Sequence, residues 1–186
     1  MATADLMERL ITAEEFRLLP DDGTPRELVR GRIVAMTVPA PRHGYFCALI
    51  VFFLNEFVRP HDLGRIMCND AGVVTERDPD TVRGPDVSYY SYARLPKGPL
   101  PEGYLKIAPE AAFEVRSPRD RWPATNARAN ELLGAGVTVV CVLDPKTESV
   151  TVYTNDNPPQ PFYKGDVLTL PDVLPGFELP IARLFE

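Results

Sequence analysis

The chain has 186 residues, a formal net charge of −6 and a hydrophobic content of 45%. This composition excludes a wholly disordered chain and supports one buried core, so we expect a single domain over residues 1–186. The acidity argues against binding nucleic acid through charge alone, because domains that do so are usually basic.

The cysteines and the apolar runs favour a cytoplasmic protein. Cys47, Cys68 and Cys141 are far apart and each lies in an apolar stretch, so we expect small buried side chains in a reducing compartment. Because there is no CxxC motif and no Cys/His cluster, a zinc site is not expected. The most apolar run, residues 45–54, is too short to cross a bilayer, so no membrane partner is expected.

The first part of the chain predicts a short helix, a hairpin and a longer helix. Residues 12–15 (Thr-Ala-Glu-Glu) form a capping box at a helix start. Residues 26–37 are typical of two strands joined at Arg30-Gly31. Apolar residues recur at helical spacing over 45–58, which predicts a helix packed on a sheet.

A strand–helix–strand unit follows these elements. The later predicted elements are strands within 65–76, a polar loop over 77–85, a strand over 86–90, a loop over 95–104, a strand over 111–115, a helix over 123–135, strands over 137–143 and 149–154, and a docking tail over 172–185. The β-branched run at 137–143 is typical of a central strand buried on both faces. Together they predict an α/β or α+β fold, with a mixed central sheet flanked by helices.

Two carboxylates stand out because they do not lie in polar loops. Asp86 begins a strand, and Glu114 lies inside an apolar strand. Such a carboxylate is rarely buried unless it is paired or binds a cation, although an outward-facing position or a salt bridge to Arg116 or Arg119 also explains Glu114. If the two strands end side by side, Asp86 and Glu114 can hold Mg²⁺, which prefers hard oxygen ligands.

Seven short motifs, spread over nearly the whole chain, occur together in an order shared with one protein family. They are TAEEF at 12–16, ELVRG at 27–31, RGPDV at 83–87, FEVRSP at 113–118, AGV at 135–137, VLDP at 142–145 and LPGFELP at 174–180. The set resembles the Uma-two family of the PD-(D/E)XK nuclease superfamily. The resemblance implies a restriction-endonuclease-like fold and DNA cleavage that depends on Mg²⁺ or Mn²⁺.

The resemblance also assigns candidate site residues. Asp86 and Glu114 match the metal-binding acids, and Glu27 matches an acid that approaches the same site. The superfamily's Lys position holds Arg116, and the alternative family position, on the following helix, falls on Arg128. A guanidinium stays protonated and cannot act as a general base, but it can clamp a phosphate.

These arginines leave more than one function open. The chain is a nuclease, weakened by the missing Lys, or a degenerate nuclease fold in which an Arg between carboxylates replaces the metal and which binds a partner or self-associates. A small-molecule binder is a third reading. Phe52, Phe53 and Phe57 share one helix and predict either a core face or a homodimer.

Two further residues have a second reading. Glu27 is placed in the site, and a strand-edge surface position paired with Arg26 or Arg32 is its alternative. His43 matches a recurring family His, but a hydrogen bond at the helix start explains it as well, so we do not place it in the site.

Overall fold

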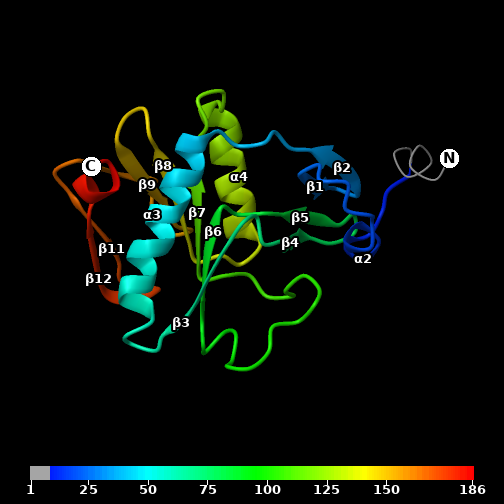
Figure 1. Cartoon of the computed structure of the whole chain (residues 1–186), viewed down its shortest axis with the longest axis horizontal. Helices are drawn as coiled ribbons and strands as arrows, with labels where there is room; N and C mark the ends of the chain where they lie inside the picture. The colour runs from blue at the N-terminus through cyan, green and yellow to red at the C-terminus, as the bar shows by residue number, and fades with distance from the viewer. Residues whose placement is uncertain (1–8) are drawn as a thin grey trace.

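The computed structural model describes residues 9–186, and its elements are shown in Figure 1. The helices are α2 (Ala13–Arg17), α3 (Pro41–Val58), α4 (Trp122–Gly134) and the 3₁₀ helix η1 (Ile181–Leu184). The strands are β1 (Arg26–Val29), β2 (Arg32–Ala35), β3 (Gly64–Cys68), β4 (Val73–Glu76), β5 (Thr81–Arg83), β6 (Val87–Ser91), β7 (Ala111–Val115), β8 (Val139–Asp144), β9 (Ser149–Tyr153), β10 (Gln160–Tyr163), β11 (Val167–Leu170) and β12 (Leu174–Pro180).

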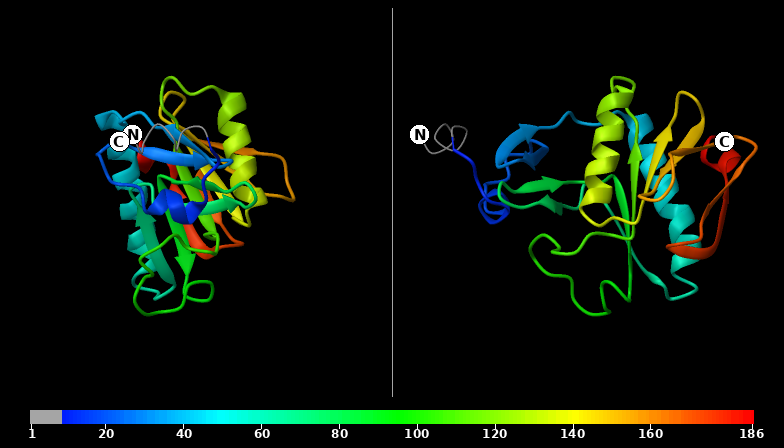
Figure 2. Two further views of the ribbon diagram at one scale, coloured as in Figure 1. Left: turned by 90° about the vertical axis from the view of Figure 1, so that its right-hand side faces the viewer. Right: turned by 180° about the vertical axis from the view of Figure 1, so that it is seen from behind.

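A six-stranded mixed sheet forms the centre of the molecule, with strand order β10-β9-β8-β7-β6-β3. Strands β7 and β8 pair in parallel and are joined through α4, whereas the other pairs in this sheet are antiparallel. Helix α3 covers one face of the sheet and α4 covers the other (Figures 1 and 2). The predicted mixed sheet with flanking helices is confirmed.

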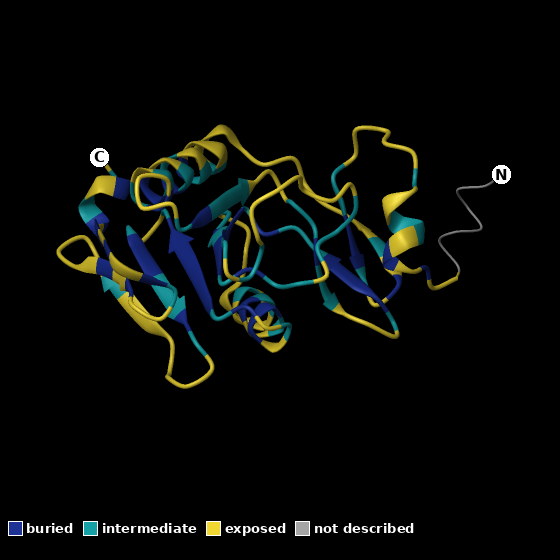
Figure 3. Cartoon of the chain, turned by 90° about the horizontal axis from the view of Figure 1, so that it is seen from below, coloured by how far each residue is buried: buried dark blue, intermediate teal, exposed yellow. Residues whose placement is uncertain are grey.

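Side-chain alternation along β7 explains the two layers of the core. Phe113 and Val115 face the α3 side, whereas Ala112 packs against Leu132 on the α4 side. Because successive side chains in a strand point to opposite faces, Glu114 shares the α4 face with Ala112. The buried residues are concentrated in the strands between the two helices (Figure 3).

A second sheet of four strands lies at the N-terminal end of the molecule, in the order β2-β1-β5-β4 (Figure 1). Its predicted hairpin is confirmed, with Arg30 and Gly31 at φ values of 49° and 74° in the turn between β1 and β2. The loop predicted over 77–85 is wrong in part, since it contains β5. Thr81 and Val82 are buried there, because β5 pairs with both β1 and β4.

The burial of side chains bears on three further expectations. The tail docks as predicted, since β11, β12 and η1 contribute to the main core. Cys141 is buried as expected, but the expectation is wrong for Cys68, which is exposed at the end of β3. Phe53 lies in the core, whereas Phe52 is 52% exposed, so the homodimer stays a prediction.

No helix within residues 9–186 is long and apolar enough to span a membrane.

Candidate active site

The central sheet brings Asp86 and Glu114 together. Strands β6 and β7 pair with Val87 opposite Phe113. Asp86 comes just before this paired register and Glu114 just after it, so the two lie at the same edge of the sheet. The Asp86 carboxylate also accepts a hydrogen bond of 2.6 Å from the backbone N–H of Val115, which fixes it at the end of β7.

Glu27 reaches the same place from the small sheet. Strand β1 pairs with β5, and β5 continues through Gly84 towards Asp86. The Glu27 side chain is only 6% exposed, and it accepts from Arg83 Nη1 at 2.9 Å, from the Gly84 N–H at 3.0 Å and from Arg128 Nη1 at 2.9 Å. Glu27 is therefore a buried and saturated acceptor, not a surface residue.

Arg128 lies between two of the predicted acids. It projects from α4 on the same face as Leu132, one turn further along, and its Nη2 donates to the Gly84 carbonyl at 2.9 Å. Its Nη1 donates to Glu27, and its Nε lies 2.9 Å from Glu114 Oε1. Although burial opposes it, the charges of Glu114 and Glu27 raise the pKa of the Arg128 guanidinium, so it stays a cation.

Gly84 allows the two sheets to meet at this point. A Cβ atom there would lie 2.7 Å from the Cβ atom of Asp70 and 2.8 Å from its backbone oxygen. The absence of a side chain therefore lets the loop between β3 and β4 pack against the segment that leads to Asp86. The close approach also leaves the Gly84 N–H and carbonyl free to hold Glu27 and Arg128.

Glu114 carries a charge that its surroundings compensate only in part. Burial raises the pKa of its carboxyl to about 7, against the opposing charge of Arg128. Its Oε1 is buried without a hydrogen bond, so the contact with Arg128 is an unaligned ion pair. Arg83 is also shared, because it binds Glu27 and, through two bonds of 2.7–2.8 Å, Glu131. Three carboxylates thus share two guanidiniums.

This pKa predicts a pH-dependent stability. Because the folded-state pKa of Glu114 is raised from 4.5 to about 7, the stability due to its protonated form is present below pH 4.5 and is lost as the pH rises through 7. With EDTA present, the melting temperature of Glu114→Gln relative to the wild type should rise by roughly 5–10 °C between pH 5 and pH 8. Glu56→Gln, at an exposed site on α3, should show no such change. Parallel pH profiles for Glu114→Gln and the wild type would contradict the assignment.

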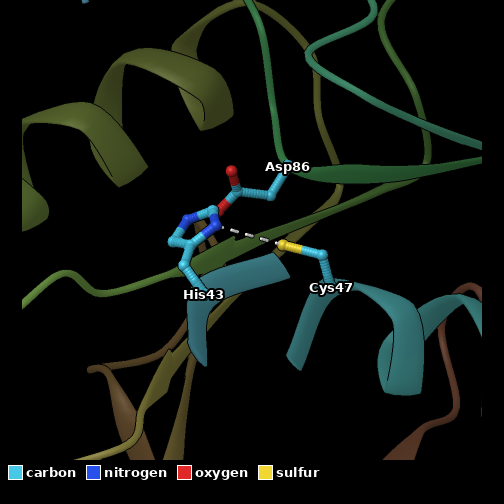
Figure 4. A group of neighbouring side chains, drawn as sticks. All are labelled: His43, Cys47 and Asp86. Carbon is cyan, nitrogen blue, oxygen red and sulfur yellow. Dashed lines mark hydrogen bonds and ion pairs between the residues drawn. The ribbon is translucent and has the colours of Figure 1, made fainter. Parts of the chain in front are cut away.

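Asp86 has a second set of neighbours on α3, which the sequence analysis did not expect (Figure 4). His43 Nε2 lies 3.2 Å from Asp86 Oδ2, and His43 Nδ1 lies 3.5 Å from Cys47 Sγ. The contact with Asp86, aided by Cys47, raises the pKa of His43 to about 10, against the effect of burial. The expectation of no Cys/His cluster is wrong, because residues 43 and 47 are one helical turn apart and so share a face.

Asp70 is a site acid that sequence reasoning missed. Burial and then the charge of Asp86 raise the pKa of its carboxyl, and Arg128 opposes this. In the sequence, Asp70 follows Asn69 in a polar turn, where a carboxylate is ordinarily on the surface. No sequence signal distinguishes it, since its position depends on the packing of its loop against Gly84.

Arg116 is held away from the predicted carboxylates. It forms a close ion pair with Asp144, its Nη2 donates to the Asp120 carbonyl at 2.7 Å, and its guanidinium lies 4.4 Å from the centroid of the Trp122 ring. These contacts hold the loop between β7 and α4. Arg128, not Arg116, contacts the acids.

The predicted acids line one cleft of about 810 Å³ between the two sheets. Its charged lining includes Glu27, His43, Asp70, Asp86, Glu114 and Arg128. Carboxylate oxygens are ligands for hard divalent cations, and Glu114 Oε1 is buried with an ion-pair contact to Arg128 Nε but without a hydrogen bond. Asp86 and Glu114 are therefore the two carboxylates that could hold a hard cation, whereas within residues 9–186 Glu27, Asp86 and Glu114 do not come close enough together to form one group of three ligands. Glu27 is the least available metal ligand, because its oxygens already accept hydrogen bonds from Arg83, Gly84 and Arg128.

The chain is similar to proteins described as putative nucleases. The Uma2 family, described as "Putative restriction endonuclease", matches residues 13–182. The chain belongs to the Uma2 family. A solved structure described as a "putative nuclease belonging to DUF820", from Anabaena variabilis ATCC 29413, aligns with a TM-score of 0.82 and 24% identity, covering 94% of this chain and 97% of that chain. No curated protein matches the chain.

Membership in Uma2 confirms two of the predictions. The recognition from motifs is correct, and the fold is restriction-endonuclease-like. The roles of Glu27, Asp86, Glu114, Arg116 and Arg128 stay predictions, because the comparisons assign no residue.

Proposed function

We propose that this Uma2 protein is an endonuclease that hydrolyses DNA phosphodiester bonds with Mg²⁺ or Mn²⁺. The observation that carries the proposal is the partly compensated charge of Glu114, buried beside Asp86 in an open cleft. A divalent cation would supply the missing positive charge. Asp86 and Glu114 would hold it, and Asp70 is a third carboxylate on the same cleft.

The bound ion would activate water and neutralise charge on the phosphodiester. Arg128 stays protonated and cannot act as the base, so the activation of water would fall to the ion. The role of Arg128 is to clamp a phosphate oxygen, and Glu27 positions it through two hydrogen bonds of 2.9 and 3.1 Å.

DNA fits the cleft better than its acidic lining suggests. Arg26 and Arg119 also line it, and Arg119 is exposed. A polyanion would therefore meet cations at the protein surface and the metal at the acids. Because the net charge is −6 and few arginines line the cleft, binding is expected to be weak.

A second function is supported by one contact. Arg128 already bridges Glu27 and Glu114, which is the arrangement expected if an arginine had replaced the metal. In that case the fold would serve as a binding or self-associating module without cleavage.

Plasmid cleavage separates these two functions. Wild-type protein with supercoiled DNA and Mg²⁺ or Mn²⁺ should give nicked and linear products, and Asp86→Ala should give none. Cleavage that persists in Asp86→Ala would indicate a contaminant or a different site. No cleavage by the wild type, together with no rise in melting temperature on adding metal, would refute the enzymatic function.

A further inference from the structure

The group of His43, Cys47 and Asp86 includes two side chains, His43 and Cys47, that the proposed nuclease reaction does not need (Figure 4). With one nitrogen taken from His43, the three ligand atoms all lie within 4.8 Å of one another. A metal ion usually needs at least three ligands. Within residues 9–186, His43, Cys47 and Asp86 are the His, Cys, Asp and Glu residues that lie close enough together to supply three.

The positions of these ligands suit a chelate site. His43 and Cys47 are four residues apart on α3, the spacing with which helices present two metal ligands on one face. Asp86 faces them from the start of β6. Ligands around a tetrahedral zinc ion lie about 3.3–3.8 Å apart, and the closest contacts here are 3.2 and 3.5 Å. Those contacts use different ring nitrogens, so metal binding requires the imidazole to reorient until one nitrogen faces both Cys47 and Asp86.

The chemistry of the ligands selects the class of metal. A thiolate and an imidazole favour Zn²⁺ and related transition metals over Mg²⁺, which prefers oxygen. Three protein ligands with a fourth position open to water is the arrangement of an accessible zinc site. His43 and Asp86 both line the cleft, so that fourth position can reach its solvent.

We propose that His43, Cys47 and Asp86 form a second metal site, selective for zinc-like cations, that competes with the Mg²⁺ site for Asp86. Because Asp86 Oδ2 already lies 3.2 Å from His43 Nε2, occupancy would hold the Asp86 carboxylate on the α3 side and make it unavailable to an ion at Glu114. Zn²⁺ would then inhibit cleavage while Mg²⁺ supports it. The inhibition rests on the proposed nuclease function, whereas the binding site does not.

Cobalt titration of the full chain tests the site without any need for activity. Co²⁺ should bind one ion per chain and give the near-ultraviolet charge-transfer absorption of a Co²⁺–thiolate bond. Zn²⁺ should abolish the band stoichiometrically, and a large excess of Mg²⁺ should not. The absorption should be lost in Cys47→Ser and Cys47→Ala, with circular dichroism confirming that each variant is folded. The exposed thiol provides the matched control, so Cys68→Ser should keep the band.

Two results would overturn the proposal. One is wild-type protein that binds no Co²⁺ or shows no thiolate band. The other is a band that survives in Cys47→Ser but disappears in Cys68→Ser, which would place the metal elsewhere. If the band behaves as expected and no DNA is cleaved with Mg²⁺, the metal site stands and only the nuclease function fails.

Discussion

Replacing Arg128 by Met is expected to lower the free energy of unfolding by about 3–5 kcal/mol at pH 8 without metal. The substitution keeps much of the side-chain volume but removes the cation that contacts both Glu27 and Glu114. Two buried carboxylates are then left with only Arg83 near Glu27. Urea unfolding followed by circular dichroism measures the loss.

A control and a rescue sharpen this prediction. Arg59→Met, at an exposed position at the end of α3, should change the stability by no more than about 0.5 kcal/mol. The substitution removes the guanidinium charge beside Glu27 and Glu114, so a divalent cation can bind there in its place. Mn²⁺ should therefore raise the melting temperature of Arg128→Met more than that of the wild type. A loss for Arg128→Met as small as that for Arg59→Met would show that the bridge contributes no stability.

Replacing Arg128 by Lys is expected to raise the rate of metal-dependent DNA cleavage by at least about 10-fold. An amine can lose its proton and assist the attacking water, and general acid–base help is typically worth about 10²–10⁴-fold. Part of that gain would be lost, because a Lys side chain has a single terminal nitrogen. It cannot contact Glu27, Glu114 and the Gly84 carbonyl together, as the branched guanidinium does. Single-turnover cleavage of a labelled duplex measures the change.

The companion variant shows which arginine stands in the Lys position. Arg116 is tied to Asp144 and Asp120, so Arg116→Lys should not raise the rate. Arg59→Lys serves as the surface control. A rise in Arg116→Lys with none in Arg128→Lys would transfer the Lys role to Arg116, and a fall in Arg128→Lys would show that the guanidinium is needed to clamp phosphate.

Much of the fold could be predicted because local signals agree with the tertiary structure. The capping box at Thr12 and the Gly31 turn act within a few residues, and both are observed. Strand β5 could not be predicted, because its short polar sequence becomes a strand only between β1 and β4. Helix α3 begins at Pro41, before the apolar pattern starts, because proline is compatible with a first helical turn.

The site could be predicted only in part, for a similar reason. Asp86 and Glu114 stand out because each interrupts or begins an apolar strand. Asp70 has no such signal, since its place on the cleft depends on the close approach of its loop to Gly84. Whether Glu27 binds a metal or an arginine was also beyond the sequence, because both depend on how β1 and α4 meet.

The most direct test of the account is the binding of Mn²⁺ to the wild type and to Glu114→Gln, followed by electron paramagnetic resonance of the free ion. The wild type should bind one ion per chain in spite of Arg128. Glu114→Gln should bind at least about 100-fold more weakly, because even residues that only support a ligand cost 10–100-fold in affinity. A wild type that binds no Mn²⁺, or equal binding by the two proteins, would contradict the account and leave Arg128 as the permanent occupant of the acidic site.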